Sequence, residues 1–141
     1  MLIASNAELK FIEAEAAFVT DKAKAYDSYL KGINAHMDML KVSAVNKAAY
    51  LAAPSVSMGA SALTLDDIFK EKYVAMFLHP ETWNDARRND YKYKNFSAPA
   101  NLNPNLGGNL IRRLAYPDSE ISRNGSNVPS VTLLDRIWWN K

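Results

Sequence analysis

The chain of 141 residues has no cysteine, only two histidines and no marked excess of either charge. Without cysteine it can form no disulfide, thiol nucleophile or thiolate metal site. His36 and His79 lie far apart in the sequence and match no metal-ligand spacing or nucleophile motif. The 17 Lys and Arg residues are balanced by 15 Asp and Glu residues, a pattern that argues against nucleic-acid binding. We therefore predict no metal, no cofactor and no nucleic-acid partner.

Long apolar runs are also missing. No segment approaches the roughly 20 apolar residues that a helix needs to cross a bilayer, and the N-terminus lacks the basic and apolar regions of an export signal. The hydrophobic content of 48% and the charged content of 23% are ordinary for a folded protein. A chain of this length fits one domain, so we predict a single domain over residues 1–141.

Two amphipathic helices are predicted in the first 40 residues. Ser5 and Glu8 have the spacing of a capping box, which marks a helix start. Apolar residues then recur every three or four positions in two stripes, one of Leu9, Ile12, Ala16 and Val19 and the other of Phe11, Ala14 and Phe18. Two stripes predict a helix that is contacted on two sides. A second periodic run from Tyr26 to Leu40 predicts the other arm of an antiparallel hairpin.

Three shorter helices are predicted in the middle of the chain. One spans Val45–Ala53 and ends before a proline, and residues 55–62 are small and polar enough to form a loop. Thr64 can cap the next helix, whose apolar positions predict a buried face of Leu65, Ile68, Phe69, Tyr73, Met76 and Phe77. Because proline suits the first turn of a helix, Pro80 should begin a short helix that carries residues 83–88.

The last third of the chain loses this periodicity. Proline and glycine recur from Tyr91 onward, which predicts a mostly irregular segment. The segment also contains several aromatic residues that need to pack, so we expect it to wrap over the helices. The predicted fold class is all-α: a helical hairpin, further helices and a long irregular C-terminal wrap. The hairpin resembles a tetratricopeptide unit, and an ordinary helical hairpin fits its period equally well.

Three groups of arginine and aromatic residues stand out in the second half of the chain. Residues 83–91 read Trp-Asn-Asp-Ala-Arg-Arg-Asn-Asp-Tyr, residues 112–120 contain a second arginine pair followed by a tyrosine, and residues 138–139 are both tryptophan. Together they resemble the C-terminal part of the SusD/RagB-like outer-membrane lipoproteins. That family captures nutrients, usually glycans, and delivers them to a SusC-like TonB-dependent transporter. The resemblance extends from the helix at Glu8 to Trp139.

The resemblance implies a nutrient-binding accessory lipoprotein at the surface of the outer membrane. Its partners would be the SusC-like transporter and an oligosaccharide or, less often, a peptide. Membrane attachment would come only from an N-terminal lipid anchor that this chain lacks, so we interpret the chain as a fragment from the C-terminal part of a longer protein. An alternative is a tetratricopeptide-like protein-interaction module without a small-molecule ligand. A third interpretation, a hydrolase fragment, has only Glu81 and Asp85, one helical turn apart, in its favour.

Two sets of site residues follow from these motifs. Aromatic faces stack on sugar rings and planar polar groups bond to hydroxyls, so the ligand-binding candidates are Trp83, Asn84, Arg87, Tyr91 and Trp139. For Trp83 and Arg87, a stacked structural pair is the favoured alternative. The residues with an expected structural role are Arg88, Arg112, Arg113, Tyr116, Glu120 and Trp138. We expect the second arginine pair to form ion pairs with Asp118 and Glu120, and we predict no catalytic residue.

Overall fold

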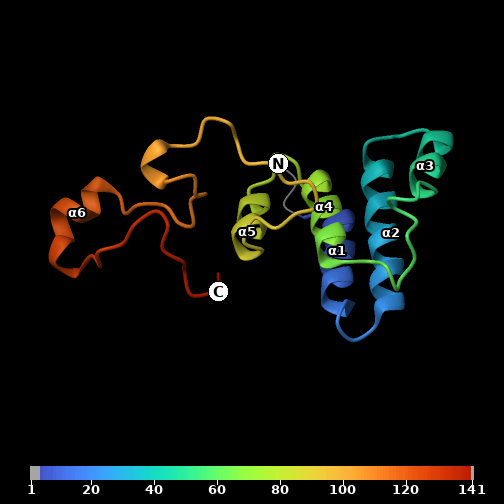
Figure 1. Ribbon diagram of the computed structural model, residues 1–141, viewed down its shortest axis with the longest axis horizontal. Coiled ribbons are helices and arrows are strands. Elements are labelled where there is room, and N and C mark those ends of the chain that lie inside the picture. The colour runs from blue at the N-terminus through green and yellow to red at the C-terminus, as the bar shows by residue number, and fades with distance from the viewer. Residues whose placement is uncertain (1–3, 141) are drawn as a thin grey trace. The chain divides into compact units, whose positions relative to one another are not determined.

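The computed structural model describes residues 4–140, and every regular element in that range is helical. The α-helices are α1 (Asn6–Ala17), α2 (Lys22–Met39), α3 (Ala44–Leu51), α4 (Leu65–Ala75), α5 (Glu81–Arg88) and α6 (Asp118–Asn124) (Figure 1). There are also two 3₁₀-helices in the described range, labelled η1 (Pro104–Leu106) and η2 (Gly125–Asn127). Within residues 4–140 there is no strand and no helix with the length and hydropathy needed to span a bilayer. The predicted all-α class is confirmed for this range.

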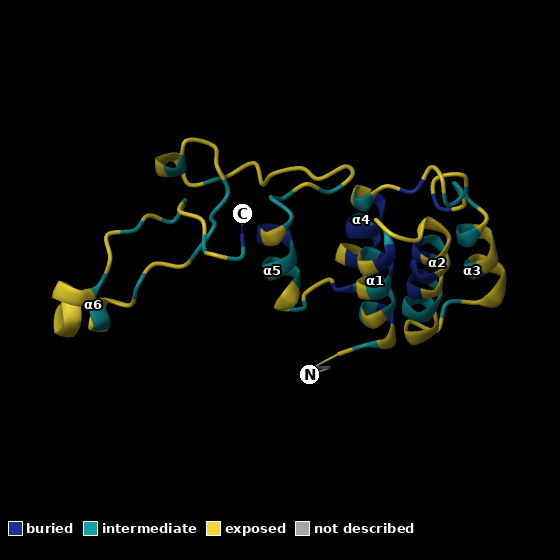
Figure 2. Cartoon of the chain, turned by 90° about the horizontal axis from the view of Figure 1, so that it is seen from below, coloured by how far each residue is buried: buried dark blue, intermediate teal, exposed yellow. Residues whose placement is uncertain are grey.

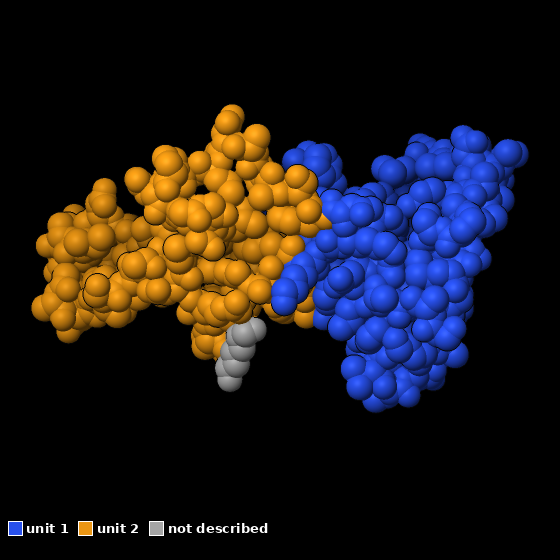
Figure 3. Space-filling model, viewed as in Figure 1, with its two compact units in different colours: residues 1–83, 92–95 blue, residues 84–91, 96–141 orange. Residues whose placement is uncertain are grey.

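The chain divides into two compact units, which Figure 3 colours separately. Unit 1 consists of residues 1–83 and 92–95, and unit 2 consists of residues 84–91 and 96–141. Helices α1 to α4 belong to unit 1, and α6 with both 3₁₀-helices belongs to unit 2. Helix α5 contributes its first turn to unit 1 and the remainder to unit 2.

Helices α1 and α2 form the predicted antiparallel hairpin, and α4 packs against both (Figure 1). Each arm begins at a side-chain cap. The Ser5 hydroxyl accepts a hydrogen bond from the Glu8 N–H at 3.0 Å, and the Asp21 carboxylate accepts one from the Lys24 N–H at 2.9 Å. Such caps satisfy amides that have no partner within the helix. Short-range signals in the sequence therefore set where both helices start.

The core of unit 1 lies where α1, α2 and α4 face one another (Figure 2). Phe11 and Tyr29 are fully buried there and meet edge to face, with ring centroids 6.5 Å apart. Gly32 makes this close packing possible, because a Cβ at that position would lie 3.0 Å from the Phe11 ring. Val56 and Leu63 are also buried. The segment predicted as a loop is thus fixed to the core near both of its ends.

Only one of the two apolar stripes of α1 is buried. Phe11 lies on the covered side, whereas Leu9, Ile12 and Val19 expose between 46% and 86% of their surface. The prediction that α1 is contacted on two sides is therefore wrong for the described part of the chain. The buried face of α1 is rich in alanine, and small side chains let neighbouring helices approach closely. Both α2 and α4 consequently fit on the same side.

Helix α4 begins with the cap predicted at Thr64. The Thr64 hydroxyl accepts from the Asp67 N–H at 3.2 Å, and the Asp67 carboxylate accepts from the Thr64 N–H at 3.2 Å, which completes a capping box. The Lys94 ammonium also donates to Asp67 at 2.7 Å. Burial acts to raise the pKa of Asp67, but hydrogen bonds from Lys94 and Thr64 outweigh it and hold that pKa below its ordinary value. The folded protein thus stabilises the charged carboxylate.

Replacing Asp67 with asparagine should lower the free energy of unfolding by about 1–2 kcal/mol at neutral pH. The amide keeps the shape of the side chain but loses the charge that faces Lys94. Because the native pKa of Asp67 lies below its unfolded value, the contribution of the carboxylate is complete above the unfolded value and is lost as the pH falls through the native one. Urea titrations of both proteins should show their difference shrinking in acid.

The matched control for this prediction is Asp66→Asn, which changes an exposed carboxylate in the same first turn. Its effect should stay within about 0.5 kcal/mol. Equal stability of the Asp67→Asn variant and the parent at pH 7 would contradict the prediction, and so would a difference that persists unchanged in acid.

The last third of the chain is mostly irregular, as predicted. Helix α5 begins directly after Pro80, also as predicted, and α6 follows Pro117. Within unit 2, the backbone N–H groups of Arg112 and Arg113 both donate to the Leu133 carbonyl, at 2.7 and 3.3 Å. Backbone bonds of this kind join irregular segments that are distant in the sequence.

Candidate functional site

The two members of the first arginine pair lie in different surroundings on α5. Arg87 is only 6% exposed; its guanidinium donates to the Arg112 carbonyl at 3.1 Å and also to the Asn84 side-chain oxygen. The guanidinium carbon lies 4.9 Å from the centre of the Trp139 ring, a cation–π contact. Arg88 is exposed and forms an ion pair with Asp85, one turn earlier, at 2.9 Å. Arg87 therefore connects α5 to two later segments of unit 2.

Asp90 carries the negative charge that faces Arg112, the first member of the second arginine pair. Its carboxylate forms ion pairs with Arg112 and, at 2.9 Å, with Arg136. The Arg112 guanidinium also lies 5.4 Å from the centre of the Tyr91 ring, and the Tyr91 hydroxyl donates to the Ile111 carbonyl. The two arginine motifs thus contact each other through charge and ring stacking.

The prediction that Asp118 and Glu120 pair with the second arginine pair is wrong. Both acids lie in the first turn of α6, where carboxylates interact favourably with the helix N-terminus. The Glu120 carboxylate accepts from the Asn124 side chain at 2.7 Å, along the same helix. Arg113 stacks instead over Tyr116, at 5.4 Å from the ring centre. Both acids thus interact within α6, where they lie in the first helical turn. The tertiary fold places Asp90, and not these acids, beside Arg112.

One ring of the tryptophan pair is packed and the other is exposed. Trp138 exposes 83% of its surface, whereas Trp139 is partly buried and lies against Arg87. The packed member of the pair is therefore Trp139. Asn140, directly after the pair, is fully buried.

Unit 2 brings together four of the five ligand-binding candidates. Asn84, Arg87 and Trp139 are in mutual contact through the Arg87 guanidinium, and Tyr91 joins them through Arg112. The Arg87 guanidinium and the Tyr91 hydroxyl donate to the Asn84 side chain and to backbone carbonyls. The fifth candidate, Trp83, belongs to unit 1 and is partly buried. Chemically, the cluster in unit 2 is well suited to hold irregular segments in place.

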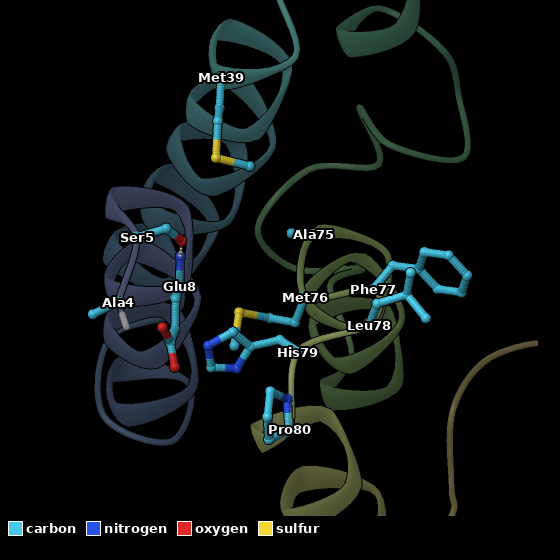
Figure 4. Close-up of a pocket in the computed structure, with 10 residues that line it drawn as sticks. All are labelled: Ala4, Ser5, Glu8, Met39, Ala75, Met76, Phe77, Leu78, His79 and Pro80. Carbon is cyan, nitrogen blue, oxygen red and sulfur yellow. Dashed lines mark hydrogen bonds between the residues drawn. The ribbon is translucent and has the colours of Figure 1, made fainter. Parts of the chain in front are cut away.

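An open pocket of about 340 Å³ lies in unit 1, where the start of α1 meets the ends of α2 and α4 (Figure 4). Its volume falls within the range typical of small-molecule sites. The side chains of Glu8 and His79 point toward each other across it (Figure 4). The Nδ1 atom of His79 accepts a hydrogen bond from the Glu81 N–H at 3.3 Å. Among residues 4–140, no group of three histidine or acidic side chains is arranged to hold a metal ion.

Exposed apolar side chains border this pocket. Phe77 and Leu78 project from the end of α4, and both are mostly exposed. Leu78 has a left-handed backbone with a φ of 65°, at a helix end where glycine is usual. The prediction that Phe77 lies on the buried face of α4 is therefore wrong. Helical spacing could not reveal the difference, because α4 ends before Phe77 and the chain turns there.

Comparison with known proteins gives a family match. Residues 1–117 match the model of a SusD-like family that is described as starch-binding and associating with the outer membrane. No curated protein and no solved structure shows significant similarity to the chain. The matched range contains α1 to α5 and both arginine pairs, and it ends before α6 and the tryptophan pair.

Proposed function

The chain belongs to the SusD-like family, which is described as starch-binding and associating with the outer membrane. We propose that it acts as part of a nutrient-binding accessory lipoprotein of a SusC-like TonB-dependent transporter. The observation that carries this proposal is the family match over residues 1–117. The nutrient in this proposal is an oligosaccharide or, less commonly, a peptide. The protein would act at the outer surface of the outer membrane, held there by an N-terminal lipid anchor.

The proposed task is to hold a nutrient and transfer it, without catalysis. Binding of this kind needs a shaped surface and hydrogen bonds rather than reactive groups. Glu81 and Asp85 lie one turn apart on α5, whereas the paired carboxylates of glycosidases face each other across a cleft. Asp85 also forms an ion pair with Arg88. These features support a structural role for both acids.

Sugar contacts within this chain are proposed for the exposed parts of Trp83, Asn84, Arg87, Tyr91 and Trp139. Their capacity is limited, because Arg87 and Tyr91 already donate hydrogen bonds to acceptors inside unit 2. We therefore expect this chain alone to bind glycans with a dissociation constant weaker than about 1 μM. Most of the affinity of the proposed full-length protein would come from elsewhere.

Calorimetry with starch-derived oligosaccharides tests this expectation. The full-length protein should bind at least one oligosaccharide or peptide, co-purify with a TonB-dependent transporter from outer membranes, and leave the ligand intact. Sub-micromolar binding by residues 1–141, lost on Trp139→Ala, would place the main site in this chain. Absence of both ligand binding and transporter association would contradict the proposed function, and reproducible cleavage would contradict the non-catalytic role.

A second candidate function is a tetratricopeptide-like protein-interaction module. It is favoured by the α1–α2 hairpin, in which alanines line the buried face of α1 and Tyr26 stacks on Tyr29 of α2 at 6.2 Å between ring centres. The exposed stripe of α1 offers a contact surface. If the chain is only such a module, Leu9→Glu on that stripe should abolish binding to the protein partner, and no glycan should bind. Saturable glycan binding by the full-length protein would instead favour the first function.

A further inference from the structure

A second pocket, of about 200 Å³, lies among α1, α2, α3 and α4 inside unit 1. Its inner wall contains Phe11, Ile33 and Glu71, all of which are buried. Leu40 and Val74 are exposed and lie at its mouth. An apolar cavity of about 150 Å³ can hold a benzene molecule. This pocket therefore has room for one aromatic ring or a short alkyl chain.

Glu71 places a carboxylate in this otherwise mainly apolar wall and is only 4% exposed. The Tyr50 hydroxyl donates to its two oxygens at 3.0 and 3.2 Å, and the Lys70 ammonium donates to Oε1 at 2.9 Å. Since each carboxylate oxygen has two acceptor positions, Oε2 can accept one more hydrogen bond. Burial of a carboxylate is costly, and an apolar side chain would complete a purely structural wall at less cost.

The other two polar side chains of the pocket carry no charge near pH 7. Burial raises the pKa of Tyr50 to about 12, with the charge of Glu71 adding to the effect, so Tyr50 remains a hydrogen-bond donor. Burial lowers the pKa of His36, and the charge of Glu71 opposes that change only in part. Of the three polar side chains that line the pocket, Glu71 is thus the one that carries a charge near pH 7.

We propose that this pocket binds a small apolar molecule with a primary amine at one end. The apolar body would pack against Phe11 and Ile33, and the ammonium group would donate to Oε2 of Glu71. An alcohol of the same shape would bind less tightly, because a hydrogen bond between two charged groups is stronger than one with a neutral partner. A carboxylic acid of the same shape would be repelled. This ligand class is independent of the nutrient-binding proposal.

Benzylamine, benzyl alcohol and benzoate are matched probes for this site. Titrated into the isotopically labelled chain, benzylamine should bind saturably, with the largest amide shifts at His36, Glu71 and Val74. Benzyl alcohol should bind about tenfold more weakly, and benzoate should not bind. Absence of saturable benzylamine binding would overturn the proposal. Equal affinity for benzylamine and benzoate would also overturn it, because the carboxylate would then have no role.

Substitutions can test the role of the pocket's space and the role of the Glu71 charge separately. Val74→Trp fills the mouth and should weaken benzylamine binding at least about tenfold, whereas Val45→Trp, at an exposed valine of α3 outside the pocket, should leave it unchanged. Glu71→Gln keeps the shape and should remove the preference for benzylamine over benzyl alcohol. If Glu71→Gln does not fold, the comparison of Val74→Trp with Val45→Trp decides the outcome. Equal binding by Val74→Trp and Val45→Trp would overturn the proposal.

Discussion

Phe11→Ala should lower the free energy of unfolding by about 3–5 kcal/mol, the usual cost of removing a fully buried phenylalanine. The ring of Phe11 is completely buried, meets Tyr29 edge to face and fills the space above Gly32. Its loss leaves a cavity that neighbouring helices cannot close without moving. Urea unfolding followed by circular dichroism at 222 nm measures the effect, and failure of the variant to fold is the extreme form of the same result.

Leu9→Ala provides the control on the other apolar stripe of the same helix. Leu9 is mostly exposed, so the substitution should change the free energy of unfolding by less than about 0.5 kcal/mol. The two substitutions remove side chains that lie two residues apart on α1, and alanine favours the helix in both. A loss for Leu9→Ala as large as that for Phe11→Ala would show that α1 is covered on both sides after all.

Arg87→Ala should destabilise unit 2 by about 2–3 kcal/mol. The substitution removes the donor to the Arg112 carbonyl, the hydrogen bond to Asn84 and the cation that lies against Trp139. Arg87→Lys should recover only part of the loss, because an ammonium group lacks the planar fork that reaches both oxygens. Amide hydrogen exchange measures the effect locally, and protection should fall for the residues of unit 2 around Arg112.

Arg88→Ala is the matched control, since it removes the same side chain from the next position of α5. Arg88 is exposed, and its ion pair with Asp85 lies within one helix. Exposed pairs of this type contribute about 0.5 kcal/mol or less. Equal loss of protection in the Arg87→Ala and Arg88→Ala variants would contradict the separate environments of the two arginines.

The sequence by itself determined where α1, α4 and α5 begin. Ser5 and Thr64 cap helices through hydrogen bonds to residues only three positions away, and Pro80 fixes the start of α5 through its own backbone. These effects act within one turn, so they can be predicted without knowledge of the rest of the fold. The irregular last third was predictable for the same reason, because proline and glycine limit helix formation locally. The motifs that contain the arginine pairs also indicated the family, which the match over residues 1–117 confirms.

Tertiary structure decided which of the available side chains meet. Helical period identifies two apolar stripes on α1, but the positions of α2 and α4 determine that Phe11 is covered and Leu9 is not. Sequence proximity suggested Glu120 as a partner of Arg112, whereas the fold supplies Asp90. Contacts of this kind depend on how the fold places segments that are distant in the sequence. The identity of a charged or apolar side chain does not by itself specify which residue it will contact. The pockets arise in the same way, since their walls come from elements that are separated in the sequence.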